Sequence, residues 1–249
     1  MRRLTWWGHS TAVLELDGVR ILTDPVLTDR VAHLRRRRGL SPATLTQPDV
    51  VLISHLHADH LHLPSLRRLG GQAPLVVPAG ARAFVRHALG DSFAERCIEL
   101  PAGQETTVAG VRVRAVPAAH DGGRHHWSRW HAEAVGYVIE AGLSVWFAGD
   151  TGLHPAMSTF GPVDLALVPV GGWGPSLGPG HLSPTQAAEA VRRIGAHMAV
   201  PIHYGTLWPI GMDQVRPHLF HDPGERFADH AIGLDVPVLT PGGVLDLPS

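Results

Sequence analysis

The chain has 249 residues, of which 44% are hydrophobic and 17% are charged, a composition that can form a hydrophobic core and excludes a disordered chain. Lys and Arg (21) nearly balance Asp and Glu (22), which argues against a dedicated nucleic-acid-binding protein, because phosphate contacts need a basic surface. The single cysteine, Cys97, excludes an internal disulfide framework, and we expect it to be a small buried hydrophobic residue. No apolar run has the length of a membrane span, and no apolar signal-peptide segment follows Arg2 and Arg3. We therefore expect a soluble, cytoplasmic protein.

Short apolar runs bounded by turn residues predict β-strands along the whole chain. In chain order, the predicted strands are Thr11–Leu16, Val19–Leu22, Val50–Ser54, Leu75–Val77, Val111–Val116, Ala134–Ile139, Ser144–Ala148, Leu165–Val168, Met198–Ile202, Pro237–Leu239 and Val244–Leu247. Helical periodicity predicts helices at Leu63–Leu69, Arg82–Leu89 and Pro184–Ile194. Ser183 is a suitable N-cap for the last helix, and Gly195 follows its end. Strands that alternate with a few helices are typical of an α/β architecture with mixed sheets.

Glycine (28) and proline (21) are distributed over the whole sequence, which indicates many tight loops rather than a hinge between independent domains. We expect residues 1–249 to form a single domain made of two strand-rich halves, an arrangement that fits a sandwich of two sheets. Nothing in the sequence indicates an oligomeric state.

Histidine is unusually abundant, with 18 residues, and several ligand-type side chains cluster directly after the predicted strand Val50–Ser54. They are His55, His57, Asp59 and His60, in the pattern H-x-H-x-D-H. Imidazole and carboxylate groups are preferred ligands of zinc and its first-row neighbours. Closely spaced residues in a tight loop point in different directions, so such a loop can reach two adjacent ions. The motif therefore predicts a metal site at the end of this strand.

This motif resembles the signature of the metallo-β-lactamase-fold hydrolases, and later motifs of that superfamily follow in the same order. His120 ends the segment P-A-A-H, Asp150 lies in F-A-G-D-T-G and His203 lies in P-I-H-Y-G-T, each at the carboxyl end of a predicted strand. The segments W-G-H-S-T at Trp7–Thr11 and T-D-P at Thr23–Pro25 are closer to the branch that contains the ascorbate-phosphate lactonases and the N-acylphosphatidylethanolamine phospholipases D. The resemblance implies an αββα sandwich, in which two mixed sheets are flanked by helices.

The resemblance also implies a cofactor of two divalent metal ions, with zinc expected and manganese or iron as alternatives. The ligands that it assigns are His55, His57 and His120 for one ion, Asp59, His60 and His203 for the other, and Asp150 as a bridge between them. The zinc β-lactamases have a Cys in the second site and no bridging carboxylate, so Asp150 argues against antibiotic hydrolysis. The flavo-diiron oxidoreductases have Glu where this chain has His57, which argues against oxygen chemistry.

Two divalent ions, two carboxylates and a bridging hydroxide leave about one net positive charge, which suits an anionic phosphoryl oxygen or a developing oxyanion. We therefore predict that a metal-bridging hydroxide cleaves a phosphodiester, or a phosphate-bearing ester or lactone, in a small substrate. The alternatives are a lactonase or thioester hydrolase acting on a non-phosphate substrate, and a metal-binding protein without catalysis.

Two residues are predicted to be catalytic. Asp59 acts as a ligand, and His181, in G-H-L-S-P, resembles a histidine that is tied to leaving-group protonation in the tRNA-processing phosphodiesterases of the superfamily. The alternative for His181 is a supporting contact to the metal centre. Asp24 and His9 are expected to hydrogen-bond to ligands and orient them, although an ordinary turn aspartate and a buried structural histidine are the competing interpretations.

Arg124 and Trp127, in the loop after His120, are candidates for substrate contact, and Trp173 is a further candidate wall of the pocket. Packing on the core is the alternative for this loop. The dense run Arg35–Arg38 predicts either a solvated loop or a basic lid over the metals that attracts phosphate-bearing substrates.

Overall fold

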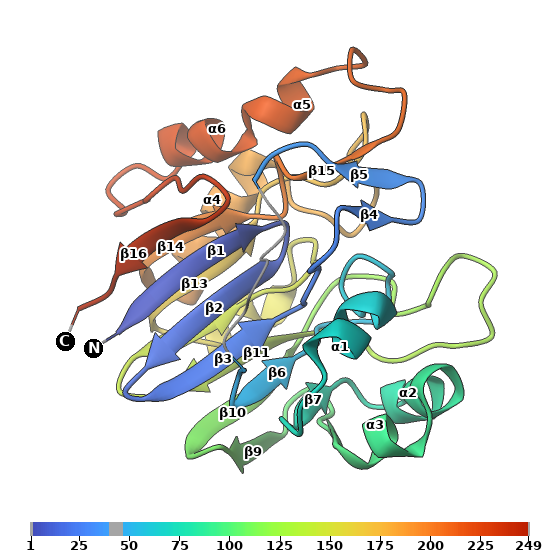
Figure 1. Cartoon of the computed structure of the whole chain (residues 1–249). Coiled ribbons are helices and arrows are strands. Elements are labelled where there is room, and N and C mark those ends of the chain that lie inside the picture. Colours follow the sequence, from blue (N-terminus) through green and yellow to red (C-terminus); the bar gives the residue numbers. More distant parts are fainter. Residues whose placement is uncertain (1, 40–46, 249) are drawn as a thin grey trace.

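The computed structural model describes residues 2–39 and 47–248, which form two large mixed sheets and a small third one (Figure 1). The first sheet has the order β16 (Gly243–Asp246), β1 (Arg3–Gly8), β2 (Thr11–Leu16), β3 (Val19–Thr23), β6 (Val50–Leu52), β7 (Leu75–Val77) and β8 (Cys97–Glu99). The second has the order β14 (Ala196–Ile202), β13 (Val163–Pro169), β12 (Ser144–Phe147), β11 (Val135–Glu140), β10 (Val111–Pro117) and β9 (Glu105–Val108). The third contains β15 (Leu207–Pro209), β5 (Leu34–Arg36) and β4 (Arg30–Val31).

Parallel pairing is confined to one side of each large sheet. Strands β3, β6, β7 and β8 run parallel, as do β12, β13 and β14, whereas the remaining neighbours are antiparallel. Because parallel strands end at the same edge, the loops that follow β6, β12 and β14 can converge. These are the loops that carry most of the predicted ligands.

The core lies between the two large sheets. Side chains alternate across each strand, so that in β10 Val113 is fully buried while Arg112 is exposed. One continuous cluster contains Trp6 and Leu14 from the first sheet together with Trp146 from the second. Burial of these large side chains holds the sheets face to face.

Helices cover the outer faces of the sandwich. The elements are α1 (Leu63–Leu69), α2 (Ala81–Leu89), α3 (Asp91–Glu95), the 3-10 turn η1 (Pro155–Thr159), α4 (Pro184–Ile194), α5 (His218–His221) and α6 (Pro223–His230). Leu66 of α1 and Phe84 of α2 pack against Val51 of the first sheet, and the buried face of α4 joins the core of the second sheet. This αββα arrangement confirms the expected fold. In the part of the chain that is described, no helix is long and apolar enough to cross a membrane.

The predicted helices agree closely with the structure. Leu63–Leu69 and Pro184–Ile194 have the expected bounds, and the remaining helix begins one residue earlier, at Ala81. In α4, the Ser183 side chain accepts from the backbone N–H of Gln186, whose own side chain accepts from the N–H of Ser183. This reciprocal cap fixes where α4 begins.

Several strand assignments differ from the sequence prediction, and the short strands β4, β5, β8, β9 and β15 were not predicted. The strand predicted as Val50–Ser54 ends at Leu52, and Pro237–Leu239 lies outside the strands. Strand β1 at Arg3–Gly8 was missed, because its arginine and tryptophan side chains hide an alternation in which every second residue is buried. The expectation for Cys97 is confirmed, since its side chain is buried and burial raises the pKa of the thiol to about 11.

Candidate metal centre

The H-x-H-x-D-H motif forms a tight turn between β6 and α1. The carbonyl oxygen of His57 accepts from the backbone N–H groups of His60 (3.1 Å) and Leu61 (2.9 Å). Pro64 lies in the first turn of α1, where a backbone N–H has no partner within the helix, so its missing N–H costs no helical hydrogen bond. The turn therefore presents closely spaced side chains at the carboxyl end of β6.

The first group of predicted ligands comes together from two distant segments. His57 Nδ1 lies 2.9 Å from His55 Nε2 and 3.1 Å from His120 Nε2. His120, at the end of β10, is fixed by a hydrogen bond from its Nδ1 to the carbonyl oxygen of Gly180 (2.9 Å). The ligand atoms of the three histidines all lie within 4.8 Å of one another, so this group could hold a metal ion.

The second group lies beside the first. His60 Nε2 is 3.2 Å from His203 Nε2, and Asp59 Oδ2 lies 3.7 Å and 3.9 Å from these two nitrogens. His203 follows β14 and donates from Nδ1 to the carbonyl oxygen of Gly171 (3.2 Å). His9 completes this cluster, and its ligand atoms also lie within 4.8 Å of one another.

Asp150 stands between the two groups. Its Oδ2 lies 3.2 Å from His60 Nε2 and 4.0 Å from His120 Nε2, and its Oδ1 lies 3.1 Å from His203 Nε2. Gly149, which precedes Asp150, has a φ of +59°. A Cβ at this position would lie 2.5 Å from the Cβ of Ser54, so only glycine fits this turn. The carboxylate therefore reaches both groups, as expected for a bridging ligand.

The donor set fits bound cations. His60 Nδ1 contacts Asp24 (2.6 Å) and His203 Nδ1 contacts a carbonyl, so in the neutral rings both Nε2 atoms carry lone pairs that face each other. Among the described residues, the buried Asp150 Oδ1 has no hydrogen-bond partner. Lone pairs and an unpaired carboxylate oxygen that converge on one region are the arrangement that a divalent cation neutralises.

The electrostatics of the site agree with this assignment. Burial lowers the pKa of His55 well below its ordinary value and that of His57 to about 4, which keeps both rings in the neutral form that binds metals. Burial opposes ionisation of Asp59 and Asp150, but the surrounding imidazoles hold both pKa values well below the usual range. Burial likewise opposes charge on His60, yet three carboxylates raise its pKa well above normal. The site therefore attracts positive charge.

Asp24 and His9 both contact predicted ligands. Asp24 Oδ2 accepts from Ser54 Oγ (2.5 Å) as well as contacting His60, and its Oδ1 accepts from the backbone N–H of Ser54. His9 Nε2 lies 2.9 Å from Asp59 Oδ2, and burial lowers the pKa of His9 to about 3, so the neutral ring donates this hydrogen bond. His9 adopts a φ of +51°, a strained conformation that is typical of functional sites.

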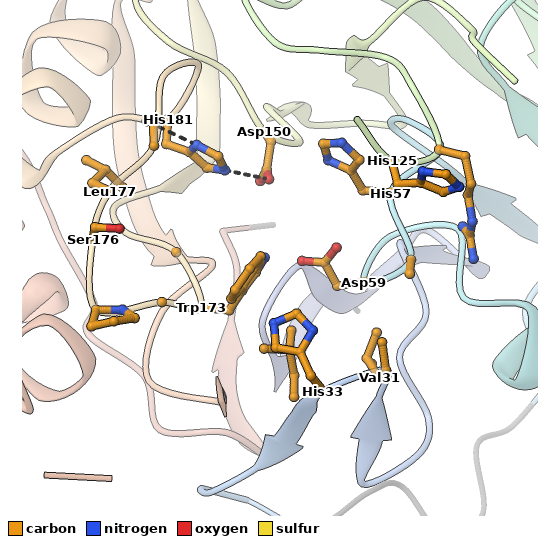
Figure 2. Close-up of a pocket in the computed structure, with 18 residues that line it drawn as sticks. Val31, His33, His57, Asp59, His125, Asp150, Trp173, Ser176, Leu177 and His181 are labelled. Carbon is orange, nitrogen blue, oxygen red and sulfur yellow. Dashed lines mark hydrogen bonds and ion pairs between the residues drawn. The ribbon is translucent and has the colours of Figure 1, made fainter. Parts of the chain in front are cut away.

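A cavity of about 540 Å³, called here the main pocket, opens above the carboxylates of Asp59 and Asp150 (Figure 2). Its other lining residues are Val31, Ala32, His33, Leu34, His57, Ala58, Arg124, His125, Gly172, Trp173, Gly174, Pro175, Ser176, Leu177, Gly178 and His181. Figure 2 shows the Trp173 ring within the cavity, between the two carboxylates and the side of the pocket formed by Ser176 and Leu177. The walls of the main pocket are thus largely apolar, whereas its floor, at the carboxylates of Asp59 and Asp150, is polar.

His181 faces the floor of the main pocket. Its Nε2 lies 3.4 Å from Asp150 Oδ2, and its Nδ1 lies 3.1 Å from the carbonyl oxygen of Pro179. Burial lowers the pKa of His181, but the hydrogen bond to Asp150 outweighs this effect and the pKa is raised. Because both ring nitrogens face acceptors, the protonated ring satisfies both contacts.

The three residues that were predicted to contact the substrate lie in three different environments. Trp173 lines the main pocket, whereas Trp127 lies outside its lining with 87% of the residue exposed. Arg124 also lines the pocket, but its Nη1 donates to the carbonyl oxygens of Leu56 (2.6 Å) and Leu61 (2.8 Å). The guanidinium of Arg124 therefore stabilises the loop that contains the H-x-H-x-D-H motif.

The run Arg35–Arg38 is exposed at Arg35 and Arg38, as in a solvated loop, but Arg36 is buried. The run begins in β5, and the Arg36 side chain is 2% exposed and donates to the carbonyl oxygens of Trp7 (3.0 Å) and Val26 (2.9 Å). None of these arginines lines the main pocket. The hairpin formed by β4 and β5 instead contributes the residues before this run to the lining of the main pocket. Among them is His33, whose ring packs edge-on against Trp173 with the two ring centroids 5.0 Å apart.

Sequence reasoning missed this hairpin wall. An apolar residue on either side of His33 was the available signal, but the following arginines obscured it. The two short strands β4 and β5 are too brief for a periodicity to appear.

Comparisons with known proteins agree with this geometry. Residues 19–204 match the family described as "Beta-lactamase superfamily domain". A UPF0173 metal-dependent hydrolase of Methanopyrus kandleri is 35% identical, over 96% of this chain and 97% of the relative. An N-acyl-phosphatidylethanolamine-hydrolyzing phospholipase D of Caenorhabditis elegans is 28% identical, over 83% of this chain and 64% of the relative. The chain also spans 66% of the length of mycobacterial relatives to which it is 34% identical.

A solved structure supports the same assignment. The metallo hydrolase of the archaeon Ignicoccus hospitalis superposes with a TM-score of 0.74 and 25% identity, and the match covers 100% of this chain and 99% of that one. The fold, the converging ligand-type side chains and these relatives together identify the chain as a member of the metallo-β-lactamase superfamily of metal-dependent hydrolases.

Proposed function

We propose that the protein is a dinuclear hydrolase that cleaves a phosphodiester or a phosphate-bearing ester or lactone. The observation that carries this proposal is the convergence of two ligand groups on Asp150, at the floor of the main pocket. His55, His57 and His120 would hold one ion, while Asp59, His60 and His203 would hold the other. A substrate in the pocket would meet both groups at once.

Zinc is the proposed metal, with manganese or iron as alternatives, because imidazole and carboxylate donors suit all three. When bound, the ions would acidify water at neutral pH and polarise the bond that is cleaved. Asp59 and Asp150 supply negative charge that is already fixed in place, so the site needs little reorganisation when the cations bind.

His181 is the proposed proton donor for the leaving group. It lines the main pocket, and its contact with Asp150 aims Nε2 at the region where the scissile bond would lie. The carbonyl oxygen of Pro179 holds the opposite face of the ring, so that the proton is presented in one orientation.

A phosphodiester substrate is supported by the Caenorhabditis elegans relative, whose name states that it hydrolyses N-acyl-phosphatidylethanolamine. The largely apolar walls above the floor would accept an apolar group attached to the phosphate. Trp173, Leu177 and Leu34 are among the large apolar side chains of the lining.

A second candidate is a lactonase or thioester hydrolase without phosphate in its substrate. The Arg124 guanidinium, which lines the main pocket, is engaged by two backbone carbonyls, and the remaining basic side chains of the lining are imidazoles. A neutral ester or lactone needs no phosphate-binding arginine, so this observation favours the second candidate.

One experiment distinguishes the candidates. Purified protein would be assayed for metal content and against matched nitrophenyl phosphodiesters, lactones and thioesters, with Asp150→Asn as the control for contaminating activity. Phosphodiester cleavage that disappears in Asp150→Asn supports the main proposal, and lactone or thioester cleavage alone supports the second. Equal activity of the wild type and the control on every substrate contradicts both.

A further inference from the structure

A second cavity, of about 280 Å³, lies behind the glycine-rich segment of residues 171–178, which we call the dividing wall. Gly172, Gly174, Ser176 and Leu177 line both this cavity and the main pocket, whereas Trp173 lines the main pocket alone. The rest of the cavity comes from the start of α4 and from the α5–α6 segment, which lie next to each other in Figure 1. The two cavities are therefore separated by one stretch of backbone.

The second cavity has a positive character. Its lining includes Arg226, His218 and His230 from α5 and α6, and it contains no aspartate or glutamate. Within residues 2–39 and 47–248, the Arg226 guanidinium has no hydrogen-bond or ion-pair partner. A cation without a protein partner at the edge of a cavity is available to an anionic ligand.

The rest of the lining is mostly apolar. Leu177, Leu219 and Pro223 provide aliphatic surface. A free inorganic anion would leave this surface unused, whereas a molecule with an apolar body would cover it. We propose that the second cavity binds an organic anion, an apolar molecule with one carboxylate, sulfonate or phosphate group that pairs with Arg226.

Such a ligand would lie next to groups that shape the metal centre. Gly171 lines the second cavity, and its carbonyl oxygen accepts the hydrogen bond from His203 Nδ1 (3.2 Å). The guanidinium of Arg216 donates to the carbonyl oxygen of Pro175 (3.2 Å) and ties the dividing wall to the loop before α5. An occupied cavity restricts the segment that carries Trp173 and thereby alters substrate affinity in the main pocket.

Calorimetric titration of the metal-loaded enzyme with 1-naphthalenesulfonate tests the binding site without relying on hydrolysis. The sulfonate is a weak metal ligand, and the naphthalene supplies the apolar body. Arg226→Gln should weaken binding by about tenfold or more, as loss of a charge-assisted hydrogen bond requires. Arg226→Lys should keep most of the affinity. Arg193→Gln, which removes an α4 arginine that pairs with Glu189, is the matched control and should bind like the wild type.

Absence of binding to the wild type overturns the proposal, as does equal affinity of the wild type and Arg226→Gln. Binding that survives Arg226→Gln but disappears when a chelator removes the metals would place the probe at the metal centre and would also overturn it. Thermal unfolding of each variant confirms that it is folded. Because the readout is binding, failure of this proposal is distinguishable from failure of the proposed reaction.

Discussion

At the floor of the main pocket, the side chains are buried and held by hydrogen bonds from segments on both sheets, whereas the walls above are loops with few such constraints. His60 is fully buried and contacts Asp24, which is itself bonded to Ser54. In contrast, Leu177 in the dividing wall is 40% exposed. Buried side chains held by hydrogen bonds position reacting groups more accurately than the side chains of exposed loops do, and exposed loops change more easily. The difference assigns the chemistry to the floor and the choice of substrate to the walls.

The largest effect is expected where the floor serves both ligand groups. Asp150→Ala removes a carboxylate that contacts His60, His120 and His203. We expect it to lose metal from both groups together and to abolish hydrolysis, whereas His120→Ala should deplete mainly one group. Elemental analysis after gel filtration measures both variants. A full metal complement in Asp150→Ala would remove its bridging role.

His181 lines the main pocket and contacts Asp150 at its floor, but it is not a predicted ligand. His181→Ala should therefore retain its metals and slow hydrolysis by roughly a hundredfold for substrates with poor leaving groups. The loss should shrink for nitrophenyl esters, which need no proton on departure. His197→Ala, which removes an exposed imidazole beside Asp164, is the matched control. Equal losses across a leaving-group series would favour substrate positioning over proton donation.

His9 tests how the floor is held in place. Its hydrogen bond to Asp59 Oδ2 orients a predicted ligand, so His9→Ala should weaken metal binding by about 10-fold to 100-fold. His9→Gln, which can still donate, should recover part of the loss. Competition with a chromogenic chelator measures both. Unchanged metal release in His9→Ala would show that Asp59 is positioned without this contact.

The smallest effects are expected in the walls, where Trp173 can be compared with Trp127, a tryptophan outside the lining. Trp173→Ala should raise KM by roughly tenfold, the consequence of losing about 1.4 kcal/mol of aromatic contact, with metal content unchanged. Trp127→Ala, which changes a residue outside the pocket lining, should leave KM unaltered. Steady-state kinetics on the same substrate compare the variants. If Trp127→Ala has the larger effect, the assignment of the walls is incorrect.

The H-x-H-x-D-H part of the floor could be predicted from the sequence because its signal is local: His55 and His60 follow an apolar strand in one short motif. His203 was assigned from its resemblance to a superfamily motif, and its convergence with them depends on how the two large sheets pack. The contact between His9 and Asp59 was expected only in outline. This contact depends on the left-handed backbone conformation of His9, which the sequence pattern does not reveal.

The walls could not be predicted in the same way. Trp127 points outward because its loop closes on itself through the Gly123–His131 bridge and the hydrogen bond from Arg124 N to Trp130 O (2.9 Å). Arg36 is buried because Trp7 of β1 and Val26 offer carbonyl oxygens to its guanidinium, although the run of arginines suggested a solvated loop. Both outcomes depend on tertiary contacts, which have no period in the sequence.

The central claim is that the floor holds two ions that share Asp150. A crystal structure of the metal-loaded protein, with anomalous data collected at the absorption edge of the metal identified by elemental analysis, tests it most directly. Two ions that share Asp150 should give two anomalous peaks about 3.5–4 Å apart, one beside His55, His57 and His120 and the other beside His60 and His203. A single peak at full loading, or two peaks of which only one lies within bonding distance of the Asp150 carboxylate, would contradict it.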